Sequence, residues 1–223
     1  MSWFAGQSVG ATLAASVTIA LLKERFQRQP KLLVLINGLY QAASLNTPSY
    51  QFNQQNAFQT KRMTSWFIGN YVFGAQTFYY ELMNCDYIGA HSDSKLGHVM
   101  SRDLLPLDEF RDSYDASSFV DSEQCRQFYE QWFDELLSDS DTTRFPLMTS
   151  HKHLRAFPKT YIYTCQYDVL RDDGLFFAHA LRRAGNDVIE IKVQDCHHLW
   201  YIIPSELQRT LFRNLMNALA QEL

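Results

Sequence analysis

Three side chains that can form a nucleophilic triad occur in this chain in the order serine, aspartate, histidine. Ser8 lies in the segment GQSVG, which matches the G-x-S-x-G pattern of a sharp strand-to-helix turn. Asp168 directly follows the run TYIYTCQY, and His198 lies in the later segment QDCHHLW. In such a triad the carboxylate fixes the tautomer of the imidazole, and the imidazole accepts the proton of the serine hydroxyl. The residue types and their order therefore indicate acyl-transfer chemistry.

Two interpretations of Ser8 stay open on the motif alone. The glycines of GQSVG could let a strand and a helix approach closely around a nucleophile, or the segment could begin a helix with small residues that pack well. A catalytic role requires the acid and the base to follow later in the chain, each past the carboxyl end of a strand. Asp168 and His198 meet this requirement, because parallel strands bring such loops to the same edge of a sheet.

Strands and helices must hold these loops, and the sequence predicts both. Apolar or alternating runs predict strands near 31–37, 160–167 and 187–193. Helices are expected over 9–28, 60–73, 121–138, 173–184 and 204–222. Since strands and helices alternate along the chain, the fold class is α/β with a parallel sheet.

The composition fits one globular domain and disfavours several classes of function. The chain has 223 residues, 46% hydrophobic content and a formal net charge of −4, which gives no electrostatic reason for a nucleic-acid partner. The sequence as written shows no targeting segment and no apolar stretch of about 20 residues. Four cysteines without CxxC spacing argue against a zinc site, and no glycine-rich nucleotide-binding pattern occurs. No metal or cofactor is expected.

The acid-loop segment YTCQYDVLRDDGLFFAHALRRAGNDV resembles the hormone-sensitive-lipase group of α/β-hydrolases, particularly its arylacetamide deacetylase-like family. That family carries Y/E-x-D-x-L-R-D-x-G, then a helix, a strand and a D-x-x-H-G loop. The segments PKLLVLINGLYQAASLNTPSYQ and GQSVGATLAA are similar to the same family, and 55–150 is the weakest part. The resemblance implies that 1–223 is the C-terminal portion of one α/β-hydrolase domain, in which 47–150 is an inserted, mainly helical substrate lobe.

The family roles are carried over residue by residue. Ser8 matches the nucleophile, and Asp168 matches the acid as the first aspartate of D-x-L-R-D. His198 matches the base, because it stands three residues after Asp195 as in D-x-x-H. Val9, which follows the nucleophile, matches a donor of the oxyanion hole.

The resemblance also implies an activity and a location. The family hydrolyses carboxylic esters or acyl amides of small or lipid substrates, without a cofactor or metal. Its location is the endoplasmic reticulum membrane or lumen, with membrane association through an N-terminal anchor. The aromatic stretch 64–84 could line an acyl pocket or contact a bilayer, or it could simply belong to the core.

Several positions depart from the family pattern. Gln7 replaces an acidic residue beside the serine, and Ala11 replaces a glycine. Leu199 stands where the family has glycine after the histidine, and is expected to crowd that loop. His197 occupies a position that is apolar or aromatic in the family, and is expected to be a packing residue. A cysteine like Cys165 pairs in the family with one near the oxyanion loop, and here that partner is expected to be absent.

Aspartates 172 and 173 follow Arg171 and are expected to order the turn into the next helix, as a cap or an ion pair.

The largest departure lies upstream of the elbow. The family has an H-G-G-G loop there that supplies oxyanion donors, whereas no H-G pair occurs in this chain and only MSWFA precedes GQSVG. The sequence is therefore expected to represent an N-terminally truncated member with a weakened oxyanion hole and an open sheet edge. The alternative to an ester hydrolase is an impaired form or pseudo-enzyme that binds lipid or a full-length relative.

Overall fold

The computed structural model describes residues 2–55, 58–74, 78–90, 95–101, 104, 122–133 and 143–222. Its centre is a parallel sheet in which the strand order β1-β2-β3-β4 follows the order along the chain. The strands are β1 (Trp3–Gln7), β2 (Leu32–Ile36), β3 (Lys159–Tyr167) and β4 (Val188–His197). The predicted parallel arrangement of the strands near 31–37, 160–167 and 187–193 is confirmed. The α/β fold class is confirmed with it.

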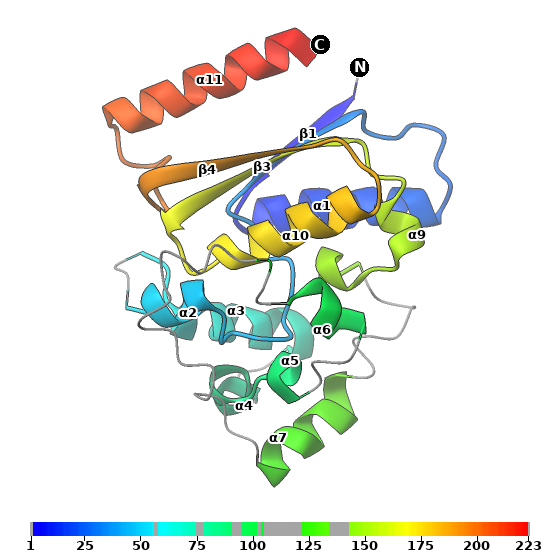
Figure 1. Ribbon diagram of the computed structural model, residues 1–223, viewed down its shortest axis with the longest axis vertical. Helices are drawn as coiled ribbons and strands as arrows, with labels where there is room; N and C mark the ends of the chain where they lie inside the picture. Colours follow the sequence, from blue (N-terminus) through cyan, green and yellow to red (C-terminus); the bar gives the residue numbers. More distant parts are fainter. Residues whose placement is uncertain are drawn as a thin grey trace.

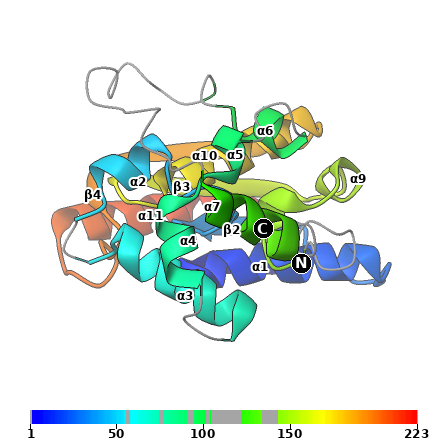
Figure 2. The same ribbon diagram turned by 90° about the horizontal axis from the view of Figure 1, so that it is seen from below.

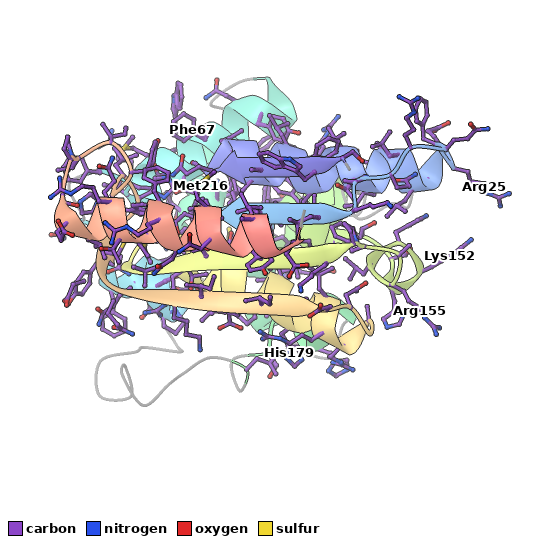
Figure 3. All side chains as sticks on the ribbon, turned by 90° about the horizontal axis from the view of Figure 1, so that it is seen from above. Arg25, Phe67, Lys152, Arg155, His179 and Met216 are labelled. Carbon is purple, nitrogen blue, oxygen red and sulfur yellow. A yellow bond between two sulfur atoms is a disulfide. The ribbon has the colours of Figure 1, made fainter. Side chains whose placement is uncertain are left out.

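Helices cover both faces of this sheet. Figure 1 shows α1 (Val9–Lys23) and α10 (Arg171–Arg183) on one face and α11 (Glu206–Glu222) on the other. Figure 3, seen from above relative to Figure 1, shows α11 lying over the sheet. The fully buried sequence LLVLI of β2 fits this position between two helical layers, because both of its faces meet apolar side chains.

The first helix ends at Lys23, short of the Arg28 expected from the sequence. Arg25 has a φ of 50°, a left-handed conformation that stops the helix. The side chain of Gln29 then donates a hydrogen bond to the carbonyl oxygen of Leu21 at 2.9 Å. This bond satisfies a helix-terminal carbonyl and turns the chain toward β2. Periodicity did not predict the end because no glycine or proline marks it.

The remaining helices gather on the side of α1 and α10 that faces away from the sheet (Figures 1 and 2). They are α2 (Pro48–Phe52), α3 (Lys61–Phe73), α4 (Tyr79–Asn84), α5 (Tyr87–Ala90), α6 (Lys95–Val99), α7 (Glu123–Phe128), η4 (Tyr129–Phe133), η5 (Pro146–Met148) and α9 (His151–Leu154). A disulfide between Cys85 and Cys125 joins the end of α4 to α7. The helix expected at 60–73 is α3. The one expected at 121–138 corresponds to α7 and η4, and its last residues lie outside the described ones.

Among the described residues, no helix has both the length and the apolar character that are needed to cross a bilayer.

Candidate active site

The turn between β1 and α1 holds Ser8 in a strained conformation. Its φ of 55° and ψ of −128° are unusual for a residue other than glycine. The backbone N–H of Ser8 donates to the carbonyl oxygen of Ile36 at 2.8 Å, which ties the turn to the end of β2. The Ser8 carbonyl accepts the N–H of Ala11 at 2.9 Å and so begins the helix. This geometry is that of a nucleophile elbow.

The two glycines of the motif have different roles. A Cβ atom on Gly6 would lie 2.1 Å from the carbonyl oxygen of Gly10, so the crossing of strand and helix requires glycine there. A Cβ atom on Gly10 would meet nothing within 4 Å. Only the first glycine is therefore needed for close approach of the backbones.

Asp168 follows β3 and is almost fully buried, with 1% of its surface exposed. One of its oxygens, Oδ1, accepts the backbone N–H of Leu170 at 2.9 Å. Its main-chain oxygen accepts a hydrogen bond from the side chain of Asn53 at 3.2 Å. These bonds fix the carboxylate and leave its second oxygen, Oδ2, directed at His198.

The imidazole of His198 joins the acid to the serine. Its Nδ1 lies 2.8 Å from Asp168 Oδ2, and its Nε2 lies 2.9 Å from Ser8 Oγ. A carboxylate can only accept, so Nδ1 carries the proton and Nε2 is free to accept the serine hydroxyl proton. His198 is 4% exposed, which keeps this chain of hydrogen bonds out of bulk water. The structure thus brings together the three residues that the sequence singled out.

Two amide side chains that the triad pattern did not identify hold the main chain of His198. Gln7 Nε2 donates to the His198 carbonyl oxygen at 3.3 Å, and Asn37 Nδ2 donates to the same oxygen at 3.4 Å. Asn37 directly follows β2 with a φ of 48°, which asparagine tolerates better than most residues. The sequence signal for this contact was the replacement of the family's acidic residue by Gln7, because a carboxylate could not donate to this carbonyl.

Cys165 pairs with Cys196, a partner other than the cysteine near the oxyanion loop that the family resemblance implied. Their Cα atoms lie 5.0 Å apart on the neighbouring strands β3 and β4. The regular pairing of these strands breaks between Cys165 and Tyr167, and β4 continues past its predicted end to His197. Cys165 lies opposite Val193 and Tyr167 lies opposite His197, so β4 has extra residues here and Cys196 can reach Cys165. The disulfide joins the two strands just before the acid and the base.

The residues on either side of the base do not displace it. The ring of His197 stacks on Phe58 with centroids 4.8 Å apart, a packing contact of the kind expected. The backbone N–H of Leu199 donates to His197 Nδ1 at 3.2 Å. Leu199 was expected to crowd the loop, yet the imidazole of His198 stays within hydrogen-bond distance of both Ser8 and Asp168.

The paired aspartates after the acid organise the start of α10. Asp172 forms a buried ion pair with Arg171 at 2.8 Å and accepts the backbone N–H of Ser49 at 2.7 Å. Asp173 accepts a hydrogen bond from Gln41 at 2.8 Å. Burial raises the pKa of Asp173 well above its usual range, and the charge of Asp172 adds to this. The segment after β2, which contains Gln41 and Ser49, is thereby hydrogen-bonded to the start of α10, shortly after Asp168.

An apolar pocket opens beside the elbow. Its volume is about 320 Å³, and Val9, the residue after the candidate nucleophile, forms part of its wall. Further parts of the wall come from α1, from α3, from Leu39 after β2 and from Phe145. Aromatic residues of the stretch 64–84, notably Phe67 and Tyr71, line it as well.

Comparisons with known proteins identify the fold family of the chain. A family described as alpha/beta hydrolase fold matches residues 2–100 and 100–202. Arylacetamide deacetylase of Oryctolagus cuniculus is 29% identical over 196 residues, which are 86% of this chain and 47% of the relative. Neutral cholesterol ester hydrolase 1 of Rattus norvegicus is 28% identical over 202 residues, again 86% of this chain and 47% of the relative. The chain spans about half the length of these curated relatives.

Solved esterases share the fold. A structure of fungal esterases from Rhizomucor miehei aligns with a TM-score of 0.62 and 18% identity, covering 97% of this chain and 50% of the other. An esterase from Pyrobaculum calidifontis aligns with a TM-score of 0.58 and 18% identity, covering 95% and 49%. The extent of the family match, the parallel sheet and the elbow lead to one conclusion: this chain belongs to the alpha/beta hydrolase fold family.

Proposed function

We propose that the chain carries a serine carboxylic-ester hydrolase site with Ser8 as nucleophile, His198 as base and Asp168 as the residue that orients the base. The observation that carries the proposal is the continuous hydrogen-bond chain from Asp168 Oδ2 through both imidazole nitrogens to Ser8 Oγ. Membership of an esterase-rich family supports it. Acyl amides are a second class of substrate for the same chemistry.

The proposed reaction has two stages. Ser8 Oγ attacks the acyl carbonyl carbon while His198 Nε2 takes the hydroxyl proton. The tetrahedral intermediate collapses, and the leaving alkoxide takes the proton from Nε2 to depart as an alcohol. Water then attacks the acyl-serine by the same route, and the carboxylic acid leaves. The Nδ1 proton stays on the imidazole throughout, where it is hydrogen-bonded to Asp168. The negative charge of Asp168 stabilises the imidazolium.

The backbone N–H of Val9 is the proposed donor to the oxyanion. It lies in the first turn of α1, where backbone N–H groups lack intrahelical acceptors and the helix dipole favours negative charge. Each such donor contributes about 100- to 1,000-fold to the rate. No H-G pair occurs in the sequence to supply the family's further donors. We therefore expect this chain to turn over esters slowly.

The pocket beside Val9 suits the apolar part of a substrate. Its volume of about 320 Å³ corresponds to roughly ten heavy atoms at about 30 Å³ each. We propose 47–150 as the substrate lobe, since α3 supplies much of the wall. Small or medium acyl groups fit this volume. Lipid substrates, membrane association and an endoplasmic-reticulum location follow from the family resemblance and are proposals for the whole protein.

Hydrolysis of p-nitrophenyl acetate by the folded chain, beside a Ser8→Ala variant, tests the proposal. We expect measurable turnover well below about 10 s⁻¹, a typical enzyme value, and its loss in the variant. Turnover that persists unchanged in Ser8→Ala would contradict the role of Ser8. Turnover near 10 s⁻¹ that depends on Ser8 would contradict the weak oxyanion hole.

Binding without catalysis is the second candidate function. Val9, Leu13 and Val17 follow one another at helical spacing along α1, and each has 46% or more of its surface exposed. Such a row favours an apolar partner, either lipid or a full-length relative. A folded chain without esterase activity that binds lipid vesicles or such a relative would favour this candidate.

A further inference from the structure

A second cavity lies at the end of the sheet opposite the candidate active site. Its volume is about 280 Å³, and residues of α6, α9, α10 and η5 line it. α10 begins three residues after Asp168 and ends at Arg183. At about 1.5 Å per residue, this length separates the two sites by roughly 20 Å. Figure 1 shows α9 at the end of the molecule away from the start of α10.

The floor of this cavity is apolar and well packed. Leu147, Leu154 and Ala180 line it, and their exposed fractions of 2%, 4% and 4% place them in the main core. Because the floor belongs to the core, its shape does not depend on mobile surface side chains. Such a floor suits the apolar part of a ligand.

Among the described residues, every ionisable side chain that lines the cavity can carry positive charge. His98, His151 and His179 come from three different helices, and Arg183 adds a guanidinium at the end of α10. Among the residues that the structure covers, no group of three histidine, cysteine or acidic side chains is arranged to hold a metal ion. The lining therefore favours an anion over a cation.

The charges around His179 also favour a bound anion. Burial lowers the pKa of His179, and the positive charges of Arg183 and Arg182 lower it further. Arg182 pairs with Glu190 at 2.6 Å, whereas no ion pair of Arg183 is found within the described part of the chain. Directly after α9, Arg155 extends outward as a further cation (Figure 3).

We propose that this cavity binds a small monocarboxylate with an apolar tail. The planar guanidinium of Arg183 matches the two oxygens of a carboxylate, and the imidazoles can donate further hydrogen bonds. A volume of about 280 Å³ holds roughly nine heavy atoms at about 30 Å³ each, which is close to the size of hexanoate. The tail lies on the apolar floor while the carboxylate meets the basic rim.

Calorimetric titration of the full chain with hexanoate, acetate, hexanol and inorganic phosphate tests this site. We expect hexanoate to bind with a Kd on the order of 1 mM, as befits a ligand of this size. Acetate lacks the tail and hexanol lacks the charge, so both should bind at least about 10-fold more weakly. Phosphate should also bind more weakly, because it leaves the apolar floor uncovered.

Two arginine variants locate the site. Arg183→Gln should weaken hexanoate binding about 10-fold, which is the usual effect of losing one charge-assisted hydrogen bond. Arg155→Gln removes an exposed arginine of the same region that does not line the cavity, and should change binding less than twofold. Thermal melting of both variants checks their folding.

Proton NMR of His179 in the unmodified chain provides a second readout that needs no variant. Hexanoate should raise the pKa of this imidazole, because a bound carboxylate offsets the arginine charges. The proposal is overturned if Arg183→Gln binds as well as the original chain, if both arginine variants weaken binding equally, if hexanol matches hexanoate, if phosphate binds more tightly, or if the His179 titration does not move.

Discussion

The carbonyl oxygen of His198 is the point at which three parts of the candidate site meet. Gln7 at the end of β1 and Asn37 after β2 both donate to it, at 3.3 Å and 3.4 Å. The two amides therefore fix the main chain that carries the base, while Asp168 fixes its ring. A carboxylate at position 7 would face the carbonyl dipole with a negative charge and no donor.

We expect Gln7→Glu to lower kcat/KM for p-nitrophenyl acetate about 10-fold, since it replaces one of the two hydrogen bonds to the His198 carbonyl with a repulsive charge, at a cost of about 1–3 kcal/mol. Gln54→Glu makes the same exchange at an exposed position and should leave kcat/KM unchanged. Equal effects of the two substitutions would mean that net charge, and not the bond to His198, is responsible.

At the scale of elements, the elbow depends on one glycine of its pair. Gly6→Ala should lower the free energy of unfolding by about 1–3 kcal/mol or more, because its Cβ would collide with backbone. Gly10→Ala should be neutral or stabilise the chain by about 0.5–1 kcal/mol, since alanine favours a helix. Urea unfolding of both variants measures the difference. Similar losses in both would contradict the described crossing of β1 and α1.

The start of α10 gives the chain a pH-dependent term in its stability. Asp173 has a pKa raised well above the usual value near 3.8. Between these two values the folded chain binds more protons than the unfolded chain, so the free energy of unfolding falls as pH rises. The stabilisation is complete below pH 3.8 and is lost as pH rises through the raised pKa.

Asp173→Asn keeps the size and the bond from Gln41 but cannot ionise. We expect this variant to be more stable than the original chain by at least about 1 kcal/mol at pH 8, with no gain at pH 4. Asp195→Asn, at an exposed position whose positive φ asparagine tolerates, serves as the control. Urea midpoints that shift equally at both pH values would refute a buried, proton-binding Asp173.

The sequence predicted the elements whose pattern is local. The apolar run of β2 and the alternation of β3 and β4 placed the sheet, and the order Ser8, Asp168, His198 predicted which side chains come together. The pairing of Cys165 with Cys196 escaped prediction because it depends on an irregularity between β3 and β4 that alternation does not show. The amides that hold His198 escaped for a similar reason, since they join three separate strands.

At the scale of the whole molecule, the parallel sheet separates two kinds of chemistry. The carboxyl ends of its strands carry the candidate triad, and the opposite end carries the basic cavity between α6, α9 and α10. α10 connects the two, with acidic residues in its first turn and arginines in its last. This charge order also matches the helix dipole, which favours acids at the start and cations at the end.

The central claim is that Ser8 is a nucleophile activated by His198. Labelling of the full chain with a fluorophosphonate, followed by intact mass and peptide mapping, tests it directly, because this reagent reports covalent attack before any product is released. We predict a single adduct on Ser8, absent from Ser8→Ala and at least about 100-fold slower in His198→Gln. A folded chain that forms no adduct, or that labels at the same rate without His198, would contradict the account.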